Sequence, residues 1–332
     1  MKLLSDIKSQ AGAVRYLTGS LQSGRIASSY LFSGPEGVGR ALCAKAFILA
    51  LLCPEKQRKD AACLKCITCR SADRLEHPDI IWIKPEKNKA IRIGEIRKVK
   101  DALNLKPYGA MVSVCVIEDA HMMTSEASNA LLKLLEEPPE RSLLVLITNR
   151  KELLLETVVS RCSEVKFRHM SFEDTKSIIR ENADLDAEAV SFLARFSQGS
   201  PGRALLMAAG DMKKRKDEVA GLLERIVKEK EAAYLVWDRD DRAGLIEDID
   251  MMVMFFRDIM MGKAGLGDKV LDREIPDTAM YRFFEKYRME ELRCIIERLI
   301  DTGRALAGNT NPKLMAQALP GYFKRAMPAG IR

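Results

Sequence analysis

The sequence contains no apolar run long enough to cross a lipid bilayer. Its longest such run, residues 41–53, is interrupted by Lys45, and a transmembrane helix needs about 20 consecutive apolar residues. The N-terminal segment also lacks the apolar core of a secretory signal, because Lys8 and Gln10 follow the first few residues. We therefore expect a cytoplasmic protein with no membrane partner. In that reducing compartment the eight cysteines should be thiols or metal ligands rather than disulfides.

Aromatic residues are scarce, at 6% of the 332-residue chain, whereas 47% of the residues are hydrophobic and 30% are charged. This balance is typical of a globular protein rich in helix, and the length predicts two or three domains. The formal net charge of +7 permits contact with nucleic acid without demonstrating it. Part of this charge lies in residues 84–100, which form either a solvated loop and helix face or a surface for DNA or a protein partner.

Short apolar runs alternate with helical patterns in the first half of the chain. Two of the runs are apolar on both faces, which is typical of buried parallel strands with helices on either side of the sheet. Thr124 is a candidate N-cap for a helix that stops at Pro138. The alternation predicts an α/β domain. Its expected strands are residues 29–32, 80–83, 112–117, 143–148 and 164–167.

Strand patterns end at about residue 168. Ser171 and Ser200 each precede a helical pattern, and Pro201 suits the first helical position of the second one. The remainder of the chain is helical in pattern nearly to its end. We therefore predict an α/β domain followed by all-α domains, with boundaries at residues 1–168, 169–209 and 210–332.

The glycines after the first strand are spaced like a phosphate-binding loop. A strand, a glycine-rich loop and a helix in this order direct backbone N–H groups and a helix N-terminus at an anion, and the glycines are Gly34, Gly37 and Gly39. Arg40 stands where a lysine would bridge the outer phosphates, and Ala41 stands where a hydroxyl would bind magnesium. The segment is thus either a weak, inefficient nucleotide site or a glycine-rich turn without a phosphate role.

Two carboxylates follow the central apolar strand that ends at residue 117. A nucleotide-hydrolysing site usually has Asp and then Glu at this point, whereas Glu118 and Asp119 stand in the inverted order. The inversion displaces both carboxylates by a methylene group. Two defects on opposite sides of one site predict a lapsed ATPase. We expect His121, nearby, to be hydrogen-bonded rather than to act as a ligand.

Four cysteines, Cys53, Cys63, Cys66 and Cys69, have the spacing C-x9-C-x2-C-x2-C. Four thiolates at this density suit tetrahedral zinc, and a closed set of four predicts a structural site. The alternatives are four ordinary free cysteines or a redox role for Cys63 and Cys66, although no thioredoxin-like pattern surrounds them. The remaining cysteines lie in apolar or helical contexts as core or incidental residues.

Together these motifs resemble the clamp-loader branch of AAA+ proteins, which serves DNA polymerase III. The resemblance extends closely over residues 1 to about 208, and beyond that only in helical character. The gamma and tau members of the family keep an intact phosphate loop, from which this chain departs at Arg40 and Ala41. The segments that carry the resemblance are residues 29–39, the four-cysteine insertion, 77–79, 91–93, 106–108, 129–139, 160–162 and 199–205.

The resemblance implies an architecture and a set of partners. It implies a RecA-like AAA+ domain with a parallel sheet and a zinc insertion at about residues 53–69, then a small helical lid and a C-terminal helical collar. It also implies a hetero-pentameric ring with gamma/tau and delta subunits, which uses ATP to load a sliding clamp on primed DNA. In this setting Arg161 would be an arginine finger for a neighbour's ATP, and Arg203 would touch nucleotide bound to its own chain. The plain alternative for Arg161 is a surface ion pair.

Two rival functions stay open at this point. One is a competent ATPase of the gamma/tau type that tolerates Arg40 and Ala41, and the other is a separate zinc-dependent DNA-binding protein. No carboxylate set for nucleotidyl transfer is recognisable, so polymerase activity would belong to the holoenzyme and not to this chain.

Overall fold

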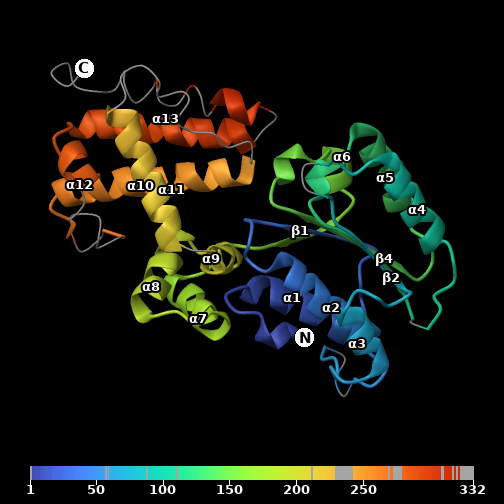
Figure 1. Cartoon of the computed structure of the whole chain (residues 1–332). Coiled ribbons are helices and arrows are strands. Elements are labelled where there is room, and N and C mark those ends of the chain that lie inside the picture. The colour runs from blue at the N-terminus through green and yellow to red at the C-terminus, as the bar shows by residue number, and fades with distance from the viewer. Residues whose placement is uncertain are drawn as a thin grey trace. The chain divides into compact units, whose positions relative to one another are not determined.

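The computed structural model divides into two compact units (Figure 1). The first comprises Met1–Asp184 and Ser197–Leu205, and the second comprises Leu185–Phe196 and Leu206–Arg332. The division into three domains at residues 168 and 209 stays a prediction. The structure describes residues 2–56, 58, 60–86, 89–109, 111–210, 212–228, 242–267, 270–271, 279–307, 310–315, 318 and 321.

The first unit is built on a five-stranded sheet in the order β2-β3-β4-β1-β5, in which every neighbouring pair is parallel. Parallel neighbours require crossovers, and helices supply them. The expected α/β fold with a parallel sheet is confirmed, and each predicted strand lies within one residue of its expected bounds. The strands are β1 (Ser29–Ser33), β2 (Ile80–Ile83), β3 (Ser113–Ile117), β4 (Ser142–Thr148) and β5 (Ser163–Lys166).

Helices cover both faces of this sheet because successive strand residues point to opposite sides. Tyr30 and Phe32 of β1 belong to one hydrophobic core, and Leu31, between them, belongs to the other. This alternation explains why the central strands are apolar throughout. The covering helices are α1 (Ala11–Ser23), α2 (Arg40–Leu52) and α3 (Ile67–Asp73) on the first face, and α4 (Ile93–Leu103), α5 (Ser125–Glu136) and α6 (Glu156–Val159) on the second (Figure 1).

Two predicted helix starts are confirmed by capping bonds. The Thr124 hydroxyl accepts a hydrogen bond from the Ala127 N–H at 3.3 Å, and the Ser171 hydroxyl accepts one from the Asp174 N–H at 3.1 Å. Such bonds satisfy N–H groups that have no partner within the helix. They begin α5 and α7 (Phe172–Asn182), and three short 3-10 turns complete this unit: η1 (Leu4–Asp6), η2 (Ala120–Met122) and η3 (Lys151–Leu153).

The described part of the second unit is helical, and α11 packs against both α13 and α12. Phe256 and Phe284 meet in its core with ring centroids 4.8 Å apart. Parts of the predicted collar, residues 229–241, 272–278 and 322–332, lie outside the described residues. Among the described helices, none is both long and apolar enough to span a membrane. The helices are α8 (Ala187–Phe196), α10 (Met212–Lys228), α11 (Arg242–Lys263), α12 (Ala279–Phe284) and α13 (Met289–Ala307), while α9 (Pro201–Ala208) crosses the boundary between the units.

Candidate functional site

A cavity of 520 Å³ in the first unit brings together the glycine loop and the carboxylates that follow β3. Further walls come from the N-terminal segment, from α7 and from the first turns of α9. The volume falls within the range of small-molecule sites, about 300–1,000 Å³. The predicted site residues that line it are Gly37, Gly39, Arg40, Ala41, Glu118 and Asp119.

Gly34 and Gly39 have different roles in the loop. Gly34 has φ +144°, and a Cβ atom there would lie 2.4 Å from the Phe167 carbonyl oxygen. It is not among the residues that line the cavity, so it serves the close approach of the loop to the end of β5. Gly39 has φ +90°, and a Cβ atom there would meet nothing within 4 Å. The space beside the Gly39 backbone is therefore open.

The loop is tied to the start of α9. The Gly202 N–H donates to the Gly37 carbonyl at 2.9 Å, and the Ser200 hydroxyl donates to the Glu36 carbonyl at 2.8 Å. A Cβ atom on Gly37 would lie 2.2 Å from the Ser200 hydroxyl oxygen, and one on Gly202 would lie 2.8 Å from the Gly37 Cα. Both positions therefore need glycine. The sequence pattern predicted a phosphate-binding role for Gly37 and no role for Gly202.

Arg40 begins α2 and lines the cavity, although only 7% of the residue is exposed. Its Nη1 atom is buried and has no hydrogen-bond partner among the described residues. Burial lowers the pKa of Arg40, while the charges of Asp119, Glu36 and Glu118 act in the opposite direction. The side chain still carries its positive charge at neutral pH, since an arginine guanidinium does not deprotonate in proteins.

Glu118 is already bound by two side chains of its own chain. The Trp82 indole N–H donates to its Oε1 at 2.8 Å, and the Lys84 Nζ lies 3.5 Å from its Oε2. Asp119, the next residue, has φ +47° in the left-handed region. Ala41 has no hydroxyl and therefore offers no ligand for magnesium, while Trp82 and Lys84 each engage one oxygen of Glu118. The inverted acidic pair in the sequence gave no indication that Trp82 and Lys84 contact Glu118.

His121 and Thr148 contact each other, and neither is among the residues that line the cavity. The His121 Nδ1 lies 3.2 Å from the Thr148 hydroxyl oxygen, which also accepts a hydrogen bond from the Arg150 N–H at 3.0 Å. Burial lowers the pKa of His121, so its imidazole is neutral at pH 7. The expectation of a hydrogen-bonded His121 is confirmed. Asn149 presents a buried Oδ1 without a partner in the described part of the chain.

Arg161 follows α6 and lies at the surface. Its Nη2 is 2.7 Å from Oε1 of Glu136, the last residue of α5, and its Nη1 donates to the Thr157 carbonyl at 3.0 Å. Its side chain is 37% exposed and that of Glu136 is 49% exposed. The guanidinium is therefore held in a defined place but stays accessible to another molecule.

Arg203 lies in the first turn of α9, where its N–H donates to the Ser200 hydroxyl at 3.4 Å. Pro201, Gly202 and Leu205 of the same helix line the cavity, and Arg203 is not among the lining residues. Contact between Arg203 and a nucleotide in this chain thus stays a prediction.

The four cysteines of the predicted zinc site converge. Their Sγ atoms all lie within 4.8 Å of one another, and those of Cys63 and Cys69 are 4.0 Å apart. Tetrahedral zinc with Zn–S bonds of about 2.3 Å separates its sulfur ligands by about 3.8 Å, so the donor set fits this ion. All four are free thiols, and a redox role for Cys63 and Cys66 stays the alternative prediction.

Backbone N–H groups donate to sulfur atoms of this cluster. The Cys66 N–H donates to the Cys63 sulfur at 3.4 Å, and the Cys63 N–H donates to the Cys53 sulfur at 3.3 Å. The N–H groups of Lys65 and Cys66 lower the pKa of the Cys63 thiol to about 7, whereas burial raises the pKa of Cys53 and Cys69. A bound cation would be needed to hold the buried pair as thiolates.

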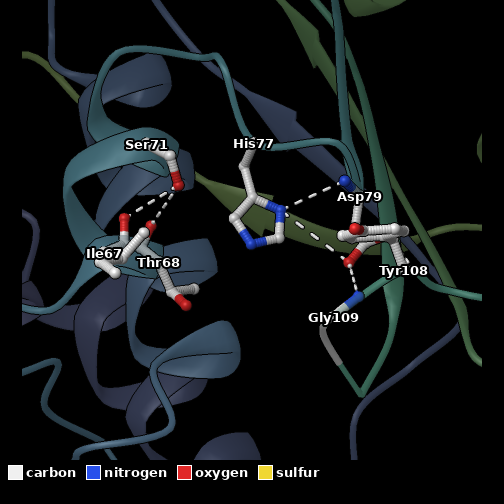
Figure 2. Close-up of polar contacts among 7 residues, drawn as sticks. All are labelled: Ile67, Thr68, Ser71, His77, Asp79, Tyr108 and Gly109. Carbon is white, nitrogen blue, oxygen red and sulfur yellow. Dashed lines mark hydrogen bonds and ion pairs between the residues drawn. The ribbon is translucent and has the colours of Figure 1, made fainter.

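Figure 2 shows a second polar cluster, which sequence reasoning noted only as a motif. The Asp79 carboxylate accepts hydrogen bonds from the N–H groups of Tyr108 at 2.6 Å and Gly109 at 3.0 Å. The Asp79 N–H in turn donates to Nδ1 of His77 at 3.2 Å. This cluster shapes the loop after α4, on which Tyr108 is 87% exposed and Met111 is 83% exposed. The sequence contained His77, Asp79 and Tyr108 in two separate motif segments, 77–79 and 106–108, without indicating that the two meet.

The sheet order, the loop after β1 and the helices on both faces are those of the RecA-like α/β fold of AAA+ proteins. A solved gamma-subunit-related protein of DNA polymerase III from Thermotoga maritima has the same fold, with a TM-score of 0.51 and 20% identity over 96% of this chain and all of that one. The family model described as DNA polymerase III, delta subunit, matches residues 9–171. The chain is thus similar to clamp-loader subunits of DNA polymerase III.

Curated relatives include several kinds of subunit from this family. Tau of Bacillus subtilis is 26% identical over 93% of this chain, delta' of the same organism is 24% identical over 80%, and delta' of Escherichia coli is 32% identical over 59%. The chain spans 59% of the length of that tau protein and 56% of a Buchnera gamma protein. Identity alone therefore does not separate the delta' type from the gamma and tau types.

Proposed function

We propose that this chain is a delta-prime-type subunit of a DNA polymerase III clamp loader and does not itself hydrolyse ATP. It would join gamma/tau and delta subunits in a hetero-pentameric ring through its C-terminal helical collar. There it would help the ring use ATP to load the sliding clamp on primed DNA. Its own chemical contribution would be the guanidinium of Arg161, lent to the ATP site of a neighbour.

The observation that carries this proposal is the composition of the cavity behind Gly39. Ala41 offers no hydroxyl for magnesium, and both oxygens of Glu118 are bound by Trp82 and Lys84. Phosphoryl transfer depends on a positioned metal and an oriented nucleophile. A cavity that keeps the loop, lacks the magnesium-binding hydroxyl and has Glu118 engaged by Trp82 and Lys84 is suited to hold its place in a ring and not to cleave ATP.

Exposure and geometry support the proposed role of Arg161. Arg161 pairs with Glu136, the last residue of α5, which belongs to the segment 129–139 that carries part of the family resemblance. Ser160 alone separates Arg161 from the end of α6. A planar, permanently charged fork is suited to charge that develops on a transferred phosphoryl group. An exposed ion pair contributes roughly 0–1 kcal/mol, so Arg161 can leave Glu136 for a stronger anion at little cost.

Reconstitution with gamma/tau and delta partners tests this function. In the assembled complex, Arg161→Ala should lower ATP hydrolysis at least several-fold, since an arginine finger contributes about 10³–10⁵ at the site it serves. The matched control is Arg168→Ala, which removes an exposed arginine just after β5 and should leave the rate unchanged. An intact complex with Arg161→Ala and full activity would show that the assignment is wrong.

The second candidate function is a competent gamma/tau-like ATPase. It is favoured by the 31% identity to a Buchnera gamma protein over 60% of this chain. Under this alternative the isolated chain would hydrolyse ATP, and Glu118→Gln together with Asp119→Asn would abolish the activity. Under the primary proposal the isolated chain shows only background hydrolysis, which the same double substitution does not change.

We further propose that the cysteine cluster holds a structural zinc ion. Cys53, Cys63, Cys66 and Cys69 would be the four ligands, and the ion would fix the insertion between α2 and α3. Purified protein should contain about one zinc ion per chain, and Cys66→Ser should lose it. Affinity should fall as the pH is lowered through the pKa of Cys63, about 7, because thiolates must be deprotonated to bind. A metal-free protein with the same thermal stability would contradict the assignment.

A further inference from the structure

Helix α7 belongs to the same compact unit as the parallel sheet. The sequence predicts a small helical lid from residue 169 onward, whereas the first unit extends to Asp184 and also includes Ser197–Leu205. Residues 167–170, which link β5 to α7, have no regular secondary structure. Contacts with other segments must therefore hold this linker and α7 in place.

Backbone hydrogen bonds hold both ends of the linker. The Phe167 N–H donates to the Ser33 carbonyl at 2.8 Å, and the Met170 N–H donates to the Gly199 carbonyl at 2.8 Å. Gly199 has φ +83°, and a Cβ atom there would lie 2.4 Å from the Met170 carbonyl oxygen. This close approach therefore requires glycine. Between the two ends, a side chain binds the backbone of Arg168.

Gln10 supplies that side chain. Its Nε2 donates to the Arg168 carbonyl at 2.7 Å, and its Oε1 accepts a hydrogen bond from the Arg168 N–H at 3.1 Å. Gln10 is only 4% exposed. It is also the N-cap of α1, yet its side chain makes no capping bond there. The buried amide thus satisfies both backbone groups of one distant residue instead of its own helix, which places it to position the linker.

The two residues before Gln10 bind α7 itself. The Ser9 hydroxyl donates to Oδ2 of Asp174, in the first turn of the helix. The Lys8 Nζ donates to the Ser177 hydroxyl at 3.1 Å and to Oε1 of Glu181. These acceptors lie along nearly the whole length of α7. The N-terminal segment therefore contacts the linker and the helix together.

We infer that residues 8–10 form a latch that holds α7 against the sheet through contacts within the chain alone, with Gln10 as the positioning residue. Gln10 holds the linker, and the two residues before it hold the helix. Met170 and Ile178 line the cavity, so the latch also sets this part of the cavity wall before any ligand enters. The inference does not rest on the proposed function, because it concerns the unassembled chain.

Hydrogen exchange of the whole chain, followed by mass spectrometry of peptides from residues 167–182, tests the latch. Gln10→Leu removes two buried hydrogen bonds, so amide exchange in these residues should become about tenfold faster or more. Exchange in β3 and β4 should stay unchanged, which separates opening of the latch from loss of fold. The matched control is Gln22→Leu, which removes an amide of α1 that donates to Asp60 at 3.1 Å. This variant should leave residues 167–182 protected.

Lys8 gives a second test that leaves the buried amide intact. The side chains of Lys8 and Glu181 are 36% and 48% exposed, so salt should screen their ion pair. Exchange of α7 in the wild type should therefore become faster with rising salt. Lys8→Met should lose this salt dependence, whereas Lys133→Met, at an exposed position of α5, should keep it. A general loss of stability would not remove the salt dependence.

Several results would overturn the inference. These are rapid exchange of residues 167–182 in the ligand-free wild type, protection that appears only after magnesium-ATP is added, and equal exchange in the wild type and Gln10→Leu. Salt dependence that Lys8→Met retains would also contradict it. None of these results bears on Arg161, whose test measures hydrolysis by the assembled complex. Failure of the latch and failure of the proposed ring function are therefore distinguishable.

Discussion

Within the chain, Arg161 contacts groups that another anion can replace at little cost in free energy. Its ion pair with Glu136 is short, at 2.7 Å, but both side chains are more than one-third exposed. Solvent screens such a pair, so it orients the guanidinium and adds little stability. For a finger that serves a neighbouring subunit, Glu136 is then a competing anion in the unassembled chain.

Replacement of Glu136 tests this competition. Glu136→Gln should change the free energy of unfolding by less than about 1 kcal/mol. It should raise the ATPase rate of a reconstituted complex modestly, by up to about fivefold, since RT at room temperature converts 1 kcal/mol to that factor. Glu137→Gln, at the next exposed position, is the matched control. A lower rate with Glu136→Gln would show that Glu136 positions the arginine instead of competing for its charge.

Asp79 is buried, unlike Arg161. Its side chain is 4% exposed, and its carboxylate accepts hydrogen bonds from two backbone N–H groups (Figure 2). Asp79→Asn replaces one acceptor oxygen with a donor and leaves one N–H group without its partner. We expect the free energy of unfolding to fall by about 2 kcal/mol, measured by urea titration with tryptophan fluorescence. The exposed Asp101→Asn should change it little. Equal stability of the two variants would mean that water accepts the hydrogen bond from the N–H group that Asp79→Asn leaves without its partner.

At the scale of the elements, the sequence predicts strands and helices well and long-range polar contacts poorly. Apolar runs and N-caps such as Thr124 and Ser171 are local signals, and they place each strand within one residue of its observed bounds. The ties of Trp82 to Glu118 and of Gly37 to Gly202 join residues far apart in the chain. No local pattern encodes them, because they depend on how the folded elements meet.

These ties decide what repair of the phosphate loop would achieve. The double variant Arg40→Lys with Ala41→Thr restores the cation and the hydroxyl of an intact loop, but Glu118 is still bound by Trp82 and Lys84. ATP hydrolysis by the isolated variant should therefore stay at background, measured as phosphate release. ATP binding should become magnesium-dependent, which verifies that the loop is functional. Hydrolysis near 1 s⁻¹, a typical enzyme rate, would show that the acidic side of the cavity is competent as it stands.

At the scale of the whole molecule, the net charge is weaker evidence for contact with nucleic acid than the fold is for similarity to clamp-loader subunits. The net charge is only +7. Within α4, Ile96, Val99 and Leu103 are buried. The N-cap Arg92 and, within the helix, Arg97, Lys98 and Lys100 are exposed. These basic residues thus form an exposed face, which is available to phosphates without being shaped for particular bases.

Binding of primed DNA to the isolated chain should follow from this face. We expect non-specific affinity, with a Kd of about 10⁻⁴–10⁻⁶ M that weakens steeply with salt, measured by fluorescence anisotropy. Arg97→Glu with Lys98→Glu should weaken it and reduce the salt slope by about two, whereas Lys65→Glu with Arg70→Glu in the cysteine insertion should have little effect. Chelation should leave DNA affinity unchanged, because the cysteine cluster lies apart from α4 in the sequence and packs on the other face of the sheet. Tight DNA binding that chelation abolishes would instead indicate a zinc-dependent DNA-binding protein. Such a result would contradict the proposed role of the chain as a subunit of a ring.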